Sequence, residues 1–176
     1  MNTTATTTEH ARMATTSKNV MPRTTISDEA RVATCNALQA CLTDMIDLAL
    51  LLKQAHWNLV GRSFRSIHLQ LDEIIEDVRA GVDEVAERMS QLGVAPDGRS
   101  QTVSQTTRLA RYPEGFVNDD ATVSQTADAL ATTVEGLREA RSKTEEPDPV
   151  TEDLLIGIIG PLEKHLWMMQ SREAKA

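Results

Sequence analysis

The sequence predicts an all-α protein: one bundle of four long helices with a long crossover connection. Leu, Ala, Val and Ile supply most of the apolar content, aromatic residues make up only 3%, and there are just eight glycines and six prolines. Apolar residues recur at alternating intervals of three and four in four separate segments. With 176 residues, the chain is long enough for one ordinary domain with a buried core.

Residues 1–26 are predicted to be a disordered N-terminal tail. They contain nine threonines and show no hydrophobic period. Their three basic residues, Arg12, Lys18 and Arg23, outnumber the single acid Glu9, so the tail is mildly cationic. We expect the folded domain to cover residues 27–173.

The first helix is predicted at about residues 27–60. Ser27 is a good N-cap and is followed by two acids, which suit a helix N-terminus. Its core stripe consists of Cys35, Leu38, Leu42, Met45, Ala49 and Leu52. Continuing this count reaches His56, which should therefore face inward or into an interface. We expect Gly61 to be the C-cap.

Three further helices are predicted from the same periodicity. They are expected at about residues 63–92, 119–143 and 149–173. Pro161 lies inside the last of them and should bend it. The connection over residues 93–118 is long enough to cross from one end of a bundle to the other, and residues 103–112 within it are expected to form a short helix. Four helices with one long crossover describe a ferritin-like bundle.

The charge balance favours cations as ligands. The net charge is −8, so the body of the protein is not built to attract nucleic acid or an anionic membrane. We find no run of about 18 apolar residues, the minimum for a membrane span. Residues 1–26 also lack the apolar core of a secretory signal. A cytoplasmic location is expected.

The two cysteines, Cys35 and Cys41, are not expected to form a disulfide. They lie six residues apart on one helix, which separates them by roughly 9 Å along its axis and places them on different faces. Bridged Cα atoms lie within about 7 Å. We interpret them as buried thiols in a reducing compartment.

A cluster of histidines and carboxylates on the first two helices has the spacing of metal ligands. His68 and Asp72 are four residues apart, as are Asp83 and Glu87, so each pair projects from one side of a helix. His56 lies twelve residues before His68, across a turn. Either pair alone would be interpreted as a solvated helix face, and an inward histidine alone as a core residue.

The distances between these pairs require a second copy of the chain. Asp72 and Asp83 are eleven residues apart, roughly 16 Å along a helix, so they cannot bind one ion within one chain. Asp72 and Asp83 have their midpoint at position 77.5, and so do His68 and Glu87. A two-fold axis at that position would set Asp72 against the partner's Asp83, and His68 against the partner's Glu87.

The predicted result is two identical metal sites per dimer. Each would take His56, His68 and Asp72 from one chain and Asp83 and Glu87 from the other. Imidazole and carboxylate ligands suit Fe, Mn, Zn or Co and do not suit a metal that prefers thiolates. With few ligands per ion, coordination positions stay open for an oxidant, which favours redox chemistry over a closed structural site.

One motif carries a family resemblance. It reads Lys53-x-x-His56-Trp57-Asn58-x-x-Gly61-x-x-Phe64-x-x-x-His68-x-x-x-Asp72, followed by Asp83-x-x-x-Glu87. This motif resembles that of the Dps family, the mini-ferritins that protect DNA in starved cells, and the resemblance covers about residues 27–172. The family's intersubunit ferroxidase ligands match His56, His68, Asp72, Asp83 and Glu87.

The resemblance implies an assembly and an activity. The chain would form a hollow homododecamer that oxidises Fe(II), preferably with hydrogen peroxide but alternatively with oxygen, at di-iron sites. The ferric product would be stored as a mineral inside the cage. Zn or Mn are alternative occupants of the sites.

The resemblance extends to residues around the site and to a route for iron. Trp57 and Trp167 resemble the family's tryptophans close to the ferroxidase site, with core packing as the alternative. His165 is expected to be a core residue or to support the ligands, with a role as an added ligand as the alternative. The acids that match the family's three-fold pore are Glu145, Glu146, Asp148, Glu152 and Asp153. These acids also complement a helix N-terminus, which leaves the pore assignment open.

Two other functions remain open at this point. The chain could be a DNA-compacting nucleoid protein with a vestigial metal site, binding DNA weakly through its tail. It could also be an unrelated helical bundle that binds zinc or manganese for structure.

Overall fold

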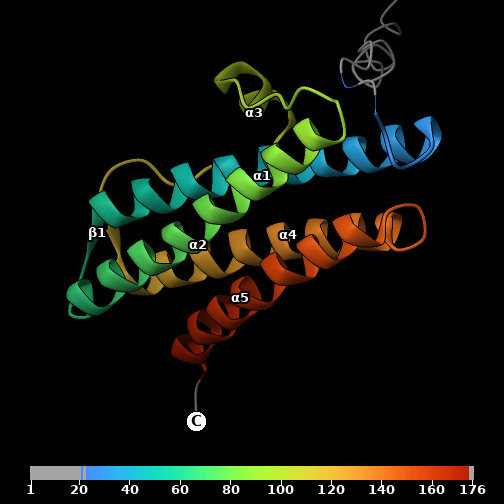
Figure 1. The fold of residues 1–176 in the computed structure, drawn as a ribbon. Helices are drawn as coiled ribbons and strands as arrows, with labels where there is room; N and C mark the ends of the chain where they lie inside the picture. Colours follow the sequence, from blue (N-terminus) through green and yellow to red (C-terminus); the bar gives the residue numbers. More distant parts are fainter. Residues whose placement is uncertain (1–20, 22, 175–176) are drawn as a thin grey trace, which may run out of the picture.

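The computed structural model describes Met21 and residues 23–174, and it confirms the predicted all-helical bundle. The four long helices are α1 (Asp28–Asn58), α2 (Phe64–Gln91), α4 (Asp119–Thr144) and α5 (Pro149–Glu173). Each packs against two neighbours, α1 against α2 and α4, and α5 against α4 and α2 (Figure 1). The predicted tail, residues 1–26, lies mostly outside the described residues.

Side-chain caps explain where two of these helices begin. The Ser27 hydroxyl accepts a hydrogen bond from the Ala30 backbone N–H at 3.1 Å, as its N-cap position predicts. The Asn118 side chain caps α4 by accepting from the Ala121 N–H at 2.9 Å. Such caps satisfy backbone donors that a helix start otherwise leaves unpaired.

The predicted C-cap at Gly61 is wrong, and the structure gives this glycine another role. Helix α1 is capped by Leu59, because the chain turns extended there to form the two-residue strand β1 (Leu59–Val60). Gly61 has a φ of 140°, and a Cβ on it would lie 2.4 Å from Cγ of Asp119. The Asp119 carboxylate accepts a hydrogen bond from the Ser63 N–H at 2.9 Å. Glycine thus lets the start of α4 approach the α1–α2 turn.

The crossover runs the length of the bundle on the α1 side (Figure 1). It contains α3 (Ser100–Thr106) and ends in β2 (Val117–Asn118), which pairs with β1 in parallel, Leu59 opposite Val117. The short helix predicted over residues 103–112 is therefore displaced toward the N-terminus. Its continuation is blocked because the Arg108 N–H donates to the Asp44 carboxylate at 2.9 Å.

A buried ion pair fastens the crossover to the bundle. Asp44 on α1 is 1% exposed, and Arg108 Nε donates to its carboxylate at 2.7 Å. The guanidinium lies over Gly136 of α4, where a Cβ would come within 1.6 Å of Arg108 Nη2. The glycine is needed at this point because the arginine occupies the space of a side chain.

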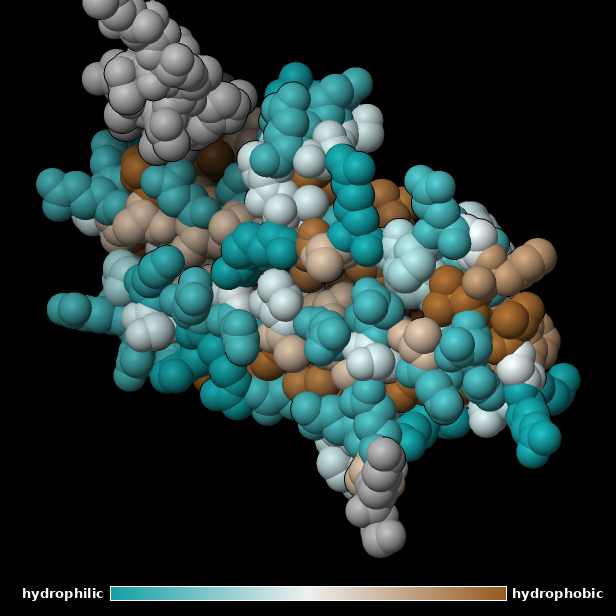
Figure 2. Space-filling view, turned by 180° about the vertical axis from the view of Figure 1, so that it is seen from behind, coloured by the Kyte–Doolittle hydropathy of each residue, from teal (hydrophilic) through white to brown (hydrophobic). Residues whose placement is uncertain are grey.

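The core is aliphatic and is centred on α1. Its largest fully buried side chains are Leu38, Leu42, Met45, Leu48, Leu52, Leu59, Ile67, Leu71, Ile74, Met89, Leu130 and Leu137. By length and composition α1 is apolar enough to cross a membrane, with a mean hydropathy of 1.4, but 67% of that window is buried inside the bundle. The core helix of a soluble protein meets the same criterion. Figure 2 shows a mainly polar surface, with apolar side chains gathered toward the end that holds β1.

Both cysteines are free and buried in the core, which confirms the prediction of no disulfide. Burial raises the pKa of Cys35 to about 11 and that of Cys41 to about 12. Both thiols are therefore protonated at neutral pH.

Candidate metal centre

Three of the five predicted ligands come together at the α1–α2 junction. His56 lies in the last turn of α1, and His68 and Asp72 occupy successive turns of α2. One potential ligand atom from each lies within 4.8 Å of the others. The short turn at residues 59–63 makes α1 and α2 neighbours, and this brings the end of one helix beside the start of the other.

The two histidines fix each other's orientation through reciprocal hydrogen bonds. His56 Nδ1 lies 3.1 Å from the backbone oxygen of His68, and His68 Nδ1 lies 3.1 Å from the backbone oxygen of His56. A carbonyl oxygen only accepts, so each Nδ1 carries a hydrogen. Nε2 is then the nitrogen of each ring that is left to bind a metal. The rings stack with centroids 3.6 Å apart, and Phe64 packs on His68 at 5.0 Å.

Asp72 is held as a carboxylate beside these rings. Lys53 Nζ donates to its Oδ1 at 2.6 Å, and this contact lowers the pKa of Asp72 below its usual range. The same oxygen lies 3.3 Å from His56 Nδ1. Burial lowers the pKa of His56, which favours the neutral imidazole that a metal requires. Asp72 and His56 are thus shifted toward the protonation states that metal ligands need.

The other two predicted ligands do not reach this cluster within one chain. Asp83 and Glu87 are exposed on the later turns of α2. Across the described range, neither makes a hydrogen bond or an ion pair. The helix rise places Asp83 roughly 16 Å from Asp72. A single chain therefore holds three donors of the proposed five.

His165 lies apart from the cluster. It is buried, and its Nε2 lies 2.8 Å from Oδ2 of Asp77 on α2. Its Nδ1 is buried and has no hydrogen-bond partner among the described residues. The structure thus favours a core position, in which His165 joins α5 to α2.

The two tryptophans are exposed. Trp57, next to His56 on α1, is 66% exposed, and Trp167 on α5 is 64% exposed. This exposure contradicts the alternative of core packing.

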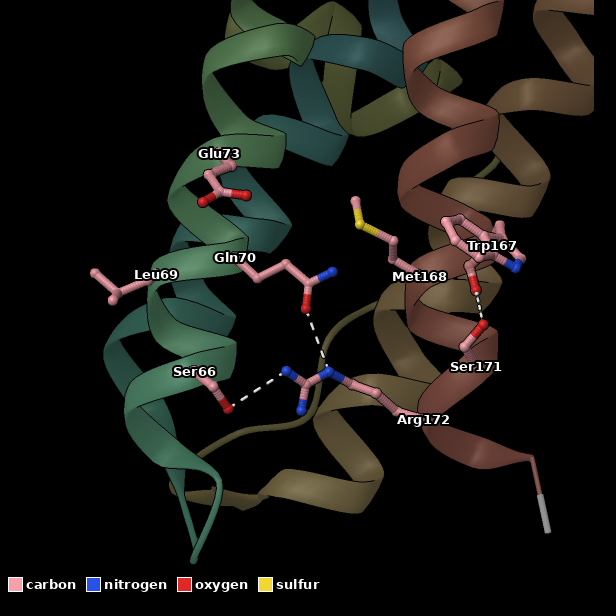
Figure 3. A pocket seen from close by; sticks show the side chains of 8 residues that line it. All are labelled: Ser66, Leu69, Gln70, Glu73, Trp167, Met168, Ser171 and Arg172. Atoms are coloured by element: carbon pink, nitrogen blue, oxygen red, sulfur yellow. Dashed lines mark hydrogen bonds between the residues drawn. The ribbon is translucent and has the colours of Figure 1, made fainter. Parts of the chain in front are cut away.

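Trp167 borders an open groove between α2 and α5, with a volume of about 500 Å³ (Figure 3). Arg172 reaches across the groove from α5 and donates to Gln70 and Ser66, each at 3.3 Å. Leu69 lies at the α2 edge of this groove (Figure 3). The groove ties the two helices together and lies apart from the histidine–aspartate cluster.

The acids at the α4–α5 junction are not equivalent, and the pore prediction is wrong for Asp148. Its carboxylate is 2% exposed and accepts hydrogen bonds from Arg88 at 2.9 Å and from the Thr151 hydroxyl. Glu152 and Glu145 both pair with Arg141, at 2.8 and 3.3 Å. Glu146 and Asp153 are exposed. A buried carboxylate that already accepts hydrogen bonds from two side chains cannot line a pore, so we leave Asp148 out of the predicted pore acids.

Sequence reasoning missed two partners of the site residues. Lys53 binds Asp72 from 19 residues away, and Asp77 binds His165 from 88 residues away. No local spacing signals contacts of that separation. Lys53 was part of the motif but carried no role there, and nothing in the pattern marked Asp77.

Comparisons with known proteins agree with this architecture. Residues 35–174 match the family model of the ferritin-like domain. The chain is 37% identical to the fine tangled pili major subunit of Haemophilus ducreyi, over 77% of this chain and 71% of that protein. It is 32% identical to the DNA protection during starvation protein of Agrobacterium fabrum, over 88% and 93%. It superposes on the tetragonal form of Mycobacterium smegmatis Dps with a TM-score of 0.84, 32% identity, and coverage of 88% and 93%.

Proposed function

Because the chain belongs to the Dps family of ferritin-like proteins, we propose that it oxidises Fe(II) at a centre that two copies complete together. The observation that carries this proposal is the half-site at the α1–α2 junction. Two imidazoles and one carboxylate each place a potential ligand atom within 4.8 Å of the others, and the Nδ1 atom of each ring faces a backbone oxygen of the other histidine. Nitrogen and carboxylate donors of this kind suit iron.

The missing donors come from the partner subunit in this proposal. Asp83 and Glu87 are exposed, lack partners within the described chain, and share with Asp72 and His68 a midpoint at 77.5 on α2. A two-fold axis at that point creates two identical sites, because every contact of an isologous interface occurs twice. Each site takes His56, His68 and Asp72 from one chain, with Asp83 and Glu87 from the other.

Iron is the substrate at this site, and we assign hydrogen peroxide as the preferred oxidant, with oxygen as the alternative. Two Fe(II) ions each lose one electron, and one H₂O₂ takes up both electrons and two protons to give two H₂O. Pairing the two irons avoids one-electron reduction of peroxide, which would release hydroxyl radical. Zn and Mn are competing occupants, because the same donors bind them.

The proposed assembly is a hollow homododecamer in the cytoplasm that stores the ferric product as a mineral. Iron would enter through a ring of acids at the α4–α5 junction by attraction of cations: the exposed Glu145, Glu146 and Asp153 and the partly buried Glu152. Trp57 and Trp167, both exposed in the single chain, would lie near the completed sites and intercept stray oxidising equivalents. Removal of iron and peroxide together would protect DNA.

Subunit complementation tests the shared site. One variant, His68→Ala with Asp72→Ala, removes the donors of the first half-site. A second, Asp83→Asn with Glu87→Gln, removes those of the other half. Each variant alone should lose rapid Fe(II) oxidation by peroxide and still assemble. A mixed dimer of the two holds one intact site, so random co-assembly should restore about a quarter of the wild-type rate.

The outcomes separate the two parts of the proposal. Wild-type oxidation kinetics in either single variant would overturn the ferroxidase assignment. Inactive variants that stay inactive after co-assembly would overturn the sharing of the site between subunits. Glu84→Gln is the matched control, since Glu84 is another exposed carboxylate of α2 and should oxidise iron as the wild type does.

Direct DNA binding is the second candidate, favoured by the Agrobacterium relative's name, DNA protection during starvation protein. The net charge of −8 disfavours contact through the body of the protein, so binding would depend on the basic residues of the tail. A gel shift at low salt, with and without residues 1–26, tests it. Retardation that disappears with the tail supports this candidate, and no retardation in either sample refutes it.

A further inference from the structure

We propose that Glu76 and Arg79 set the register of the α2–α2 interface through two ion pairs across the two-fold axis. This inference rests on the proposed function, since that axis is the one that completes the metal sites. Glu76 and Arg79 also have their midpoint at 77.5. In an antiparallel pair of helices, Glu76 then lies opposite Arg79 of the partner subunit, and Arg79 opposite the partner's Glu76.

The two residues lie on the same face of α2 as the metal donors. An α-helix turns by about 100° per residue, so Asp72, Glu76, Arg79 and Asp83 fall within a sector roughly 60° wide. The core-facing residues Ile67, Ile74 and Val78 occupy a different side of the helix, and all are buried. The ion pair would therefore lie between the two metal sites on one continuous contact face.

Both side chains are available for a partner. Glu76 and Arg79 are exposed, and within residues 23–174 neither takes part in an ion pair or a hydrogen bond. They are three residues apart and of opposite sign, yet they do not pair with each other in the single chain. In contrast, Asp77 and Arg88 of the same helix are engaged by His165 and Asp148 of α5.

An apolar pair obeys the same symmetry. Leu69 and Ala86 also share the midpoint at 77.5. Leu69 is 47% exposed at the edge of the α2–α5 groove, so a second copy can reach it (Figure 3). The axis therefore sets acid against base, apolar against apolar, and His68 against Glu87 of the partner subunit.

A different register of the two α2 helices would no longer place these complementary residues opposite each other. Moving the axis one turn toward the N-terminus, to residue 74, opposes Asp72 to Glu76 of the partner subunit, so that like charges meet twice. Moving it by half a residue, to 78, shifts the register by one residue and opposes Glu76 to Ala80 and Asp72 to Glu84 of the partner subunit. The sequence of α2 thus favours the one register that also completes the metal sites.

Charge reversal and charge exchange test this inference in the full chain. Glu76→Arg places four arginines around the axis, and Arg79→Glu places four glutamates there. Each should raise the dissociation constant of the dimer on the order of 100-fold, because like charges are brought together twice. The double variant Glu76→Arg with Arg79→Glu restores two ion pairs and should assemble within about threefold of the wild type. Glu84→Arg is the matched control: it makes the same charge change on α2, outside the contact sector.

Sedimentation at low and high salt gives the assembly state, and circular dichroism verifies that each variant remains helical. Dissociation by either reversal, recovery in the double variant and no change in Glu84→Arg support the inference. Assembly of both reversals like the wild type, or failure of the double variant to recover, overturns it. Neither of those results affects the complementation test, so the shared ferroxidase site stands or falls on its own experiment.

Discussion

His56 and His68 hold each other in place: each donates from Nδ1 to the other's backbone carbonyl at 3.1 Å. The donors of the metal site are therefore oriented by the chain itself, before any ion binds.

In this arrangement, Nδ1 of His68 contributes to the stability of the fold, whereas Nε2 is the atom proposed to bind the metal. In His68→Asn, the side-chain amide replaces Nδ1 as donor to the His56 carbonyl, and no group replaces Nε2. We expect His68→Asn to retain about 1 kcal/mol of unfolding free energy that His68→Ala loses, while both variants lose Co(II) binding. Denaturant unfolding and Co(II) absorption titrations measure the two effects. Co(II) binding by the asparagine variant with wild-type affinity would contradict Nε2 as the ligand.

The buried thiols should be unreactive in the folded protein. With a pKa of about 11, Cys35 is ionised to about one part in a thousand at pH 8, and Cys41, with a pKa of about 12, even less. We expect no reaction with a disulfide reagent until the protein unfolds, when both thiols react. Rapid labelling of the native protein would show that the core opens locally.

The same thiols make stability depend on alkaline pH. Unfolded thiols ionise near their ordinary pKa of 9.0, whereas folded Cys35 keeps its proton up to about 11. The unfolded state therefore loses protons first, and the free energy of unfolding falls as pH rises above about 9. The variant Cys35→Ala with Cys41→Ala should show a shallower fall, measured by denaturant unfolding at several pH values.

The buried ion pair should contribute more to the free energy of unfolding than the exposed one. Arg88 and Asp148 have side chains only 14% and 3% exposed, against 58% and 37% for Arg138 and Glu163. Arg88→Met leaves a buried carboxylate unpaired and should cost about 3–5 kcal/mol of unfolding free energy. Arg138→Met, the control, should cost under about 1 kcal/mol. Equal losses in the two variants would mean that Asp148 finds another partner.

Two helical glycines should respond in opposite directions to alanine. In Gly136→Ala, the new Cβ would lie 1.6 Å from Arg108 Nη2, so the guanidinium must leave the buried Asp44. We expect a loss of about 1–3 kcal/mol. Gly157 has open space at its Cβ position, so Gly157→Ala should gain roughly 0.5–1 kcal/mol. Thermal unfolding of the two variants tests this. A higher melting temperature in both would show that the position of the Arg108 guanidinium over Gly136 does not contribute to stability.

Local periodicity accounts for the parts of the molecule that could be predicted. The helices follow from three- and four-residue spacing, and the same spacing placed His68 beside Asp72 on successive turns of α2. His56 could be added because the core stripe of α1 leads to it. Each of these inferences needed only residues on one helix or across one short turn.

Tertiary contacts account for what the pattern missed. The sequence predicts Gly61 as a helix cap, but the carboxylate of Asp119, distant in the sequence, decides its conformation. The sequence predicts Asp148 as a pore acid, but Arg88 binds its buried carboxylate. The predicted end of α3 is wrong because Arg108, just after the helix, is bound by Asp44. In each case the deciding partner lies more than 50 residues away in the sequence.

The two-residue sheet of β1 and β2 bears on the order of folding. Pairing Leu59 with Val117 closes a loop that contains all of α2 and the crossover, at an entropic cost of roughly 4 kcal/mol. Two residues on each strand cannot offset that cost alone, so the pairing has to follow the packing of the helices. The α1–α2 hairpin, by contrast, is joined by a short turn and requires only local contacts. The histidine–aspartate half-site can therefore form early, before the crossover is fastened and before a second subunit is met.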